Sequence, residues 1–272
     1  MTGLYLVAGG IGAISAAAVS ARWNWWRPRA HGLPVLMYHR IGDPPAGSRL
    51  KKLWVRLADF RWQMEHLLRD GYTPLLFSEL EALEAGKSPK PPRPVIITFD
   101  DGTADNYELA FPALRELDVK ANIFLVCDAV GGHNSWEDPA VGPWQRMLSW
   151  GRVLEMQESG LVEFGSHTMS HRDLARLPVE EARWEVRESK KRLEDRLGRP
   201  VTAFAYPYGS GARVPELRAA VREAGYRYDY GIRQGISPWP DGRDEAAKRL
   251  LIRGDDLRID FRLNLTRGRA RL

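Results

Sequence analysis

Two acidic residues, Asp100 and Asp101, stand side by side directly after an apolar, β-branched run at residues 95–99. Adjacent carboxylates repel each other, so a compensating cation is expected close to them. An ordinary Asp-Asp-Gly turn is the alternative, because these residue types also favour tight turns. The pair is therefore a candidate either for metal binding or for moving a proton.

Two histidines, His167 and His171, follow a second predicted strand at residues 161–165. Their spacing places both imidazoles on one face of a helical turn, where they could reach one ion. Alone, such a pair is more often a surface or core feature. With one carboxylate, however, it supplies the three ligands of a catalytic zinc site that keeps a fourth position for water. The second carboxylate could then accept a proton from that water.

A third segment, residues 204–209, runs from a strand into a proline-containing turn, which by itself indicates only a rigid aromatic turn. Together, residues 98–102, 166–171 and 206–209 resemble, in order and approximate spacing, the polysaccharide deacetylase (NodB-like) family. The resemblance covers about residues 33–255 and implies a metal-dependent carbohydrate esterase. The implied fold is α/β, a distorted (β/α) barrel of about seven strands.

The resemblance assigns roles to individual residues. It implies Asp100 as general base, the backbone N–H of Tyr208 as oxyanion donor, and as metal ligands Asp101, His167 and His171. The implied reaction removes N-acetyl groups from N-acetylglucosamine-type sugars in a polysaccharide or glycolipid, by attack of a metal-bound water. Zinc is the expected metal, although cobalt or nickel would also accept these ligands.

The proton donor departs from the family pattern. The usual Leu-x-His motif reads Leu-Ile-Arg here and ends at Arg253, and arginine cannot act as an acid near neutral pH. We hypothesise that His39 is the general acid, because it ends the early strand at 35–39 and so lies at the same rim. A Tyr-His strand ending is similar to the poly-N-acetylglucosamine deacetylase branch. A structural role for His39 and an acid role for His133 are the alternatives. We expect Arg253 to orient Asp100 or to bind substrate.

Substrate contacts are expected from Arg253, Pro207, Trp136 and Trp239. For the two tryptophans, the reason is that aromatic rings stack on sugars, although buried aromatic anchors are equally common. Two other functions stay open. One is hydrolysis of a different amide, such as deformylation of a lipid-linked amino sugar. The other is a carbohydrate-binding pseudoenzyme, which the missing Leu-x-His motif would allow.

Predicted strands and helices alternate along the chain and must position these residues. This alternation predicts a parallel β/α fold, either a barrel or a doubly wound sheet. In both, the functional residues lie at the carboxyl ends of the strands. A capping box of Ser78 and Glu81 is expected to begin one helix. Strands are expected at 34–38, 72–77, 95–99, 121–126, 161–165, 201–206, 227–232 and 250–252, and helices at 58–70, 78–85, 107–117, 150–159, 180–197 and 214–224.

Composition narrows the class of protein. The 272 residues are 44% hydrophobic and 28% charged, which excludes a mainly disordered chain. One cysteine, Cys127, excludes an intramolecular disulfide framework. The net charge is +5, but residues 1–30 carry three arginines and residues 262–272 carry four, without acids, so the body carries −2. No cationic face for nucleic acid is expected, and no protein partner is inferred.

Residues 2–21 contain no charged side chain, and a helix of that length would span about 30 Å, the thickness of a bilayer core. Arginines and tryptophans follow at 22–27, as at a membrane interface. We therefore expect a single-pass N-terminal transmembrane helix at the cell membrane, with a cleaved signal peptide as the alternative.

The expected organisation is a membrane anchor and linker at 1–30, a catalytic domain at 31–261 and a basic tail at 262–272. The arginines favour a cytoplasmic domain and the family resemblance an external one, so the side stays open.

Overall fold

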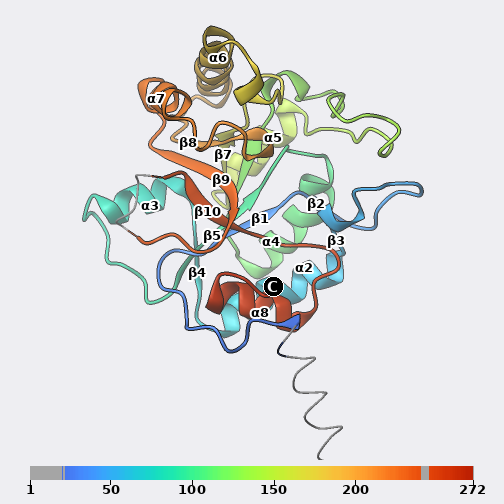
Figure 1. Ribbon diagram of the computed structural model, residues 1–272, viewed down its shortest axis with the longest axis vertical. Helices are drawn as coiled ribbons and strands as arrows, with labels where there is room; N and C mark the ends of the chain where they lie inside the picture. The colour runs from blue at the N-terminus through green and yellow to red at the C-terminus, as the bar shows by residue number, and fades with distance from the viewer. Residues whose placement is uncertain (1–19, 21, 240–244, 272) are drawn as a thin grey trace, which may run out of the picture.

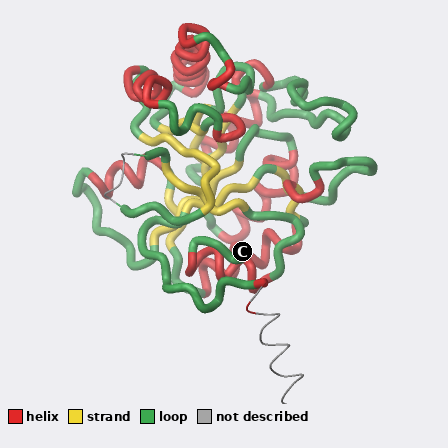
Figure 2. The backbone as a smooth tube through the Cα atoms, viewed as in Figure 1, coloured by secondary structure: helices red, strands yellow, loops and turns green. Residues whose placement is uncertain are grey.

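The computed structural model describes residues 20, 22–239 and 245–271. Its centre is a closed barrel of seven parallel strands surrounded by helices, which confirms the predicted β/α barrel (Figures 1 and 2). Pairing of β1 with β5 closes the barrel, and β4 (Thr73–Leu75) adds to β5 outside the ring. In barrel order the strands are β1 (Val35–Tyr38), β10 (Ala247–Leu251), β9 (Tyr228–Gln234), β8 (Ala203–Ala205), β7 (Val162–Ser166), β6 (Ala121–Leu125) and β5 (Pro94–Phe99).

The predicted helices are all present in the described residues. They are α2 (Leu57–Arg69), α3 (Phe77–Glu84), α4 (Phe111–Leu117), α5 (Trp150–Glu158), α6 (Val179–Leu197) and α7 (Pro215–Glu223), with α8 (Arg258–Arg267) in addition. Short elements connect them: β2 (Arg40–Ile41), β3 (Trp54–Val55), a π-helical turn η2 (Asn106–Ala110) and the 3₁₀ turns η1 (Lys51–Leu53), η3 (Cys127–Ala129), η4 (Leu174–Arg176) and η5 (Pro207–Gly209).

The predicted start of α3 is wrong. The helix begins at Phe77, and the N–H of Leu76 donates to Oε2 of Glu79 at 2.9 Å, so the capping pair lies two residues before the expected one. Ser78 instead donates through its hydroxyl to Glu163, with 2.8 Å between the oxygens. Phe77, the first residue of the helix, is fully buried and packs against the ring of Phe124 of β6, with 5.4 Å between ring centroids, so the apolar contact favours the earlier start.

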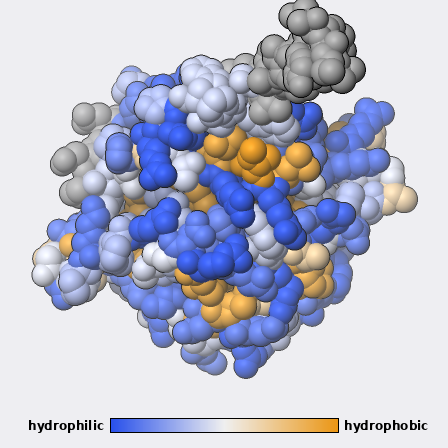
Figure 3. Space-filling model, turned by 90° about the horizontal axis from the view of Figure 1, so that it is seen from below, coloured by the Kyte–Doolittle hydropathy of each residue, from blue (hydrophilic) through white to orange (hydrophobic). Residues whose placement is uncertain are grey.

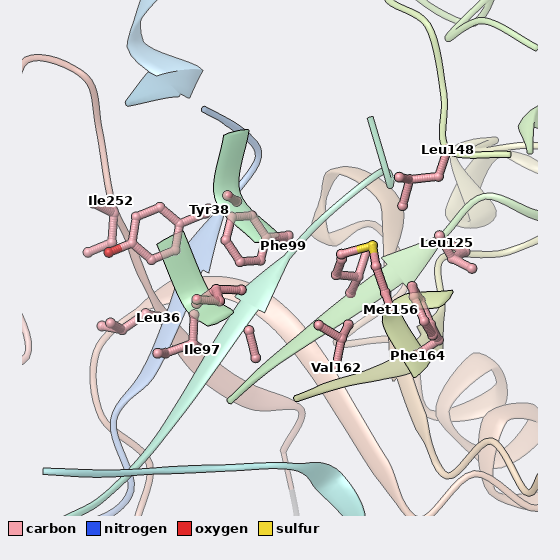
Figure 4. Packing of buried hydrophobic residues seen from close by; sticks show 14 of the residues in the cluster. Leu36, Tyr38, Ile97, Phe99, Leu125, Leu148, Met156, Val162, Phe164 and Ile252 are labelled. Carbon is pink, nitrogen blue, oxygen red and sulfur yellow. The ribbon is translucent and has the colours of Figure 1, made fainter. Parts of the chain in front are cut away.

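Side chains that alternate along each strand build two layers of core. Figure 4 shows the layer that includes Leu36 and Tyr38 of β1 and Ile97 and Phe99 of β5. There the Tyr38 ring meets the edge of Phe60 from α2, with 5.4 Å between ring centroids. The intervening strand residues, such as Val35 and Ile96, belong to a second cluster with Phe124 and Ala203. Because both faces of the strands are buried, the barrel is a rigid support for its rim.

The two described ends of the chain lie together beside α8 (Figure 1). The indole N–H of Trp23 donates to Asp260 at 2.8 Å, and the N–H of Asn24 donates to the carbonyl of Ala270 at 2.8 Å. The boundary predicted at residue 261 falls inside α8, whose residues Leu263 and Leu265 are buried. Residues 262–271 therefore form part of the folded domain and are not a separate tail.

The predicted transmembrane segment, residues 2–21, lies outside the described residues except for Ser20. Within the described part of the chain, no helix combines the length and apolarity needed to cross a bilayer. Seen from below, the surface is mainly hydrophilic, with separate apolar patches (Figure 3).

Candidate metal and catalytic site

Three predicted metal ligands meet at the carboxyl ends of β5 and β7. Oδ1 of Asp101 lies 3.6 Å from Nε2 of His167 and 3.3 Å from Nε2 of His171. The three ligand atoms lie within 4.8 Å of one another, and all three residues are buried. One carboxylate oxygen and two imidazole nitrogens converging on one point are a donor set that zinc and similar divalent ions accept.

Hydrogen bonds to the far nitrogens of the histidines orient both rings. Nδ1 of His167 lies 2.8 Å from the carbonyl oxygen of Ala205. Because a carbonyl only accepts, Nδ1 carries the proton and Nε2 keeps its lone pair for an ion. Nδ1 of His171 lies 3.1 Å from the hydroxyl of Tyr208. Outer contacts of this kind are typical of histidines that bind metals.

The protonation states also suit a cation. Burial lowers the pKa of His167 to about 4, against the opposing effect of the Asp100 charge, so its imidazole is neutral at pH 7. Burial alone would raise the pKa of Asp101, but the hydrogen bond with His171, together with the other neighbouring histidines, holds that pKa well below its ordinary value. The site therefore presents a carboxylate and a neutral imidazole, the forms in which these groups bind metal.

The second carboxylate, Asp100, is held by an arginine that the sequence analysis missed. Nη1 and Nη2 of Arg249 donate to the two Asp100 oxygens at 2.6 and 2.7 Å, and both side chains are buried. Burial would raise the pKa of Asp100, but the charge of Arg249 leads the groups that together hold that pKa below its ordinary value. The sequence feature that could have pointed to this partner of Asp100 is a basic residue at position 249, just before the predicted strand at 250–252.

The expectation that Arg253 orients Asp100 is wrong. Arg253 lies beyond the end of β10, and its guanidinium donates to both oxygens of Asp255, at 2.9 and 3.1 Å. Arg249, within β10, orients Asp100 in its place.

His39 directly follows β1, beside the end of β5, where the N–H of Asp100 donates to the carbonyl of Tyr38 at 2.9 Å. Burial lowers its pKa, whereas the charges of Asp100 and Asp101 act in the opposite direction. Asn106 donates from Nδ2 to the His39 carbonyl at 3.1 Å and so fixes its backbone. The alternative acid, His133, is exposed and forms a backbone bridge with Arg146.

The predicted substrate contacts separate in space. The Trp136 ring stacks on His171, with centroids 4.5 Å apart, and Pro207 begins the turn that carries Tyr208. Trp239, in contrast, donates to Glu84 at 3.0 Å and lines a pocket with Val35, at the start of β1. This is the opposite end of the barrel from the metal ligands, so Trp239 is not part of their site.

Comparisons with known proteins identify the family to which the chain belongs. The family model described as polysaccharide deacetylase matches residues 87–228. YxkH of Bacillus subtilis (strain 168), which carries the polysaccharide deacetylase name, is 30% identical over 211 residues, or 77% of this chain and 68% of the relative. The poly-beta-1,6-N-acetyl-D-glucosamine N-deacetylase of Staphylococcus epidermidis is 28% identical over 240 residues, or 81% and 79%. A solved polysaccharide deacetylase of Bacillus cereus has a TM-score of 0.72 at 28% identity, covering 86% of this chain and 69% of the other. The chain belongs to the polysaccharide deacetylase family.

Proposed function

We propose that this protein uses a divalent metal, most naturally zinc, to remove N-acetyl groups from N-acetylglucosamine-type sugars in a polysaccharide or glycolipid. The observation that carries the proposal is the Asp101, His167 and His171 group beside the ion pair of Asp100 and Arg249. The name of the Staphylococcus epidermidis relative supports the sugar.

The metal ligands would be Asp101, His167 and His171, and a bound divalent ion supplies Lewis acidity toward the acetyl carbonyl and toward water. Asp100 would take the proton of the attacking water, and Arg249 holds its carboxylate ionised and fixed for that transfer. The backbone N–H of Tyr208 would stabilise the negative charge that develops on the acetyl oxygen. Tyr208 has a positive φ of 57° in its turn, next to His171.

A proton must also reach the leaving nitrogen, because an amine is a poor leaving group. His39 would supply it, since this histidine follows β1 beside the end of β5, where Asp100 and Asp101 lie, and the charges of both carboxylates act on its pKa. Trp136 and Pro207 would form part of the wall against which the sugar binds, beside His171 and Tyr208.

The test is acetate release by the full-length protein from acetylated β-1,6-linked glucosamine oligomers, after chelation and again after zinc is restored. We expect release only with metal present, and none from Asp100→Asn. Asp118→Asn is the matched control, because Asp118 is exposed at the end of α4 and its φ of 51° is one that asparagine tolerates. Formate release from a formylated sugar in place of acetate release, or sugar binding without turnover by zinc-loaded protein, would overturn the proposal.

We further propose that residues 2–21 anchor the protein in the cell membrane. The adjoining Trp25 and Trp26 support this, because half or more of each side chain is exposed, at 50% and 55%, and Arg27 follows them. Deletion of residues 2–21 should move the protein from the membrane fraction to the supernatant. A reporter fused after Leu272 would identify the side of the membrane on which the domain lies.

A further inference from the structure

A buried glutamate of α6, Glu185, lies against the loop that carries both metal-binding histidines. Only 2% of this residue is exposed. Its Oε2 accepts hydrogen bonds from the N–H groups of Met169 and Ser170, at 2.8 and 3.0 Å, and its Oε1 accepts one from the Ser170 hydroxyl. No described lysine, arginine or histidine forms a salt bridge with it. Among the described residues, the hydrogen bonds to its carboxylate come from this one loop.

The loop adopts a backbone that needs support. Thr168 and His171 have φ angles of 70° and 60°, in the left-handed region that residues with a Cβ rarely adopt. Local bonds account for part of the support, since the N–H of His171 donates to the Thr168 hydroxyl at 3.0 Å. The N–H groups of Met169 and Ser170, between the two strained positions, point instead at Glu185.

The same helix also holds the start of the loop. One turn beyond Glu185, the hydroxyl of Ser189 lies 2.8 Å from that of Ser166, which accepts a hydrogen bond from the N–H of Thr168. Helix α6 thus supports the segment before His167 through Ser189 and the segment between the histidines through Glu185. A buried carboxylate costs free energy unless its oxygens are satisfied, and here the loop satisfies both of them.

We propose that Glu185 is a positioning residue for the metal site: its carboxylate holds the left-handed loop so that Nε2 of both histidines faces Asp101. This rests on the proposed metal-dependent function. Loss of the carboxylate leaves the two N–H groups unpaired and frees the loop to relax, which separates the ligand atoms and weakens metal binding. Partners outside the ligand set typically change metal affinity by about 10- to 100-fold.

The experiment compares zinc affinity, measured by competition with a chromophoric chelator, and the visible spectrum of the cobalt-loaded protein. The full-length variants are Glu185→Ala, Glu185→Gln and Ser170→Ala. Glu188→Ala is the matched control, because Glu188 is on the same helix and its ion-pair partner is Arg187, 3.8 Å away. The melting temperature of each metal-free protein measures the purely structural effect.

We expect Glu185→Ala to weaken zinc binding at least tenfold and to alter the cobalt spectrum. Glu185→Gln should recover part of the affinity, because its amide oxygen can still accept both N–H groups, and Glu188→Ala should stay within about twofold of wild type. A Glu185→Ala protein that melts lower but binds zinc as wild type would overturn the positioning role alone. If that variant does not fold, wild-type affinity in both Glu185→Gln and Ser170→Ala would overturn it. A wild-type protein that binds no divalent metal would overturn both this role and the proposed function.

Discussion

Arg249 and Asp100 form a buried, bidentate ion pair at the rim of the barrel, with nitrogen–oxygen distances of 2.6 and 2.7 Å. The pair joins β10 to the end of β5, on either side of β1 in the closed ring. A third nitrogen of the same guanidinium, Nε, donates to the carbonyl of Gly231 at 2.8 Å. The carboxylate that is proposed to take the proton is therefore fixed from a strand distant in sequence.

Arg249→Lys should lower kcat for deacetylation at least tenfold, because an ammonium cannot reproduce the two parallel hydrogen bonds of a guanidinium. Arg249→Met should also destabilise the fold by about 3–5 kcal/mol, since it leaves Asp100 buried without its partner. Steady-state kinetics and denaturant unfolding measure the two effects. Equal kcat in wild type and Arg249→Lys would show that Asp100 does not depend on the pair.

Asp101→Asn should abolish the stabilisation that zinc gives the wild-type protein. A ligand present at 100 times its Kd stabilises the folded state by about 2.7 kcal/mol, which is visible as a rise in Tm. The variant lacks the anionic ligand, so its Tm should not respond to zinc. Calorimetric scans with and without zinc make the comparison, with Asp118→Asn as control. An unchanged zinc response in Asp101→Asn would place the ion elsewhere.

His39→Ala should lose most activity toward the N-acetyl sugar but much less toward 4-nitrophenyl acetate. The phenolate leaves without being protonated, whereas the amine needs a proton donor. His133→Ala should resemble wild type on both substrates, because His133 is exposed in its loop. An equal loss on both substrates would argue for a positioning role of His39, and near-normal turnover of the sugar would remove it from the mechanism.

The stability of the protein should fall between pH 4 and about pH 7 through Asp105. Burial raises the pKa of this carboxyl to about 6, so the folded state favours the protonated form. The contribution of the protonated Asp105 carboxyl to the free energy of unfolding is fully present below the ordinary pKa of this group, near 4. It is lost as the pH rises through about 6. The loss is on the order of 1–3 kcal/mol. Asp105→Asn keeps an oxygen for the N–H of Ile41 and should remove this part of the pH dependence, measured as the difference in unfolding free energy between pH 4.5 and pH 8. An identical difference in the variant would exclude Asp105 as its source.

The parts of the structure that depend on local pattern were predictable. Apolar runs and helical periodicity locate the barrel elements, and the short segments around Asp101 and His167 indicate the metal ligands because strand ends gather at one rim. Glu185 left a weaker signal, as an acid on the otherwise small and apolar face of α6 that includes Ala182 and Val186.

Features that depend on distant pairing were not predictable. Arg249 meets Asp100 only because β10 and β5 both pair with β1, a register that no local pattern encodes. The arginines after residue 261 suggested a tail, but alternate apolar side chains bury that segment against the domain. For Trp239, the residue type alone suggests a sugar contact, but residue type cannot distinguish the two ends of a barrel.

The most direct test of the metal site is an anomalous difference map at the zinc edge, from crystals of the full-length protein grown with zinc. The account predicts one strong peak about 2.0–2.2 Å from a carboxylate oxygen of Asp101 and from Nε2 of His167 and His171, with Asp100 free of the ion. A peak bound by other residues, or none at these three in zinc-saturated crystals, would contradict it.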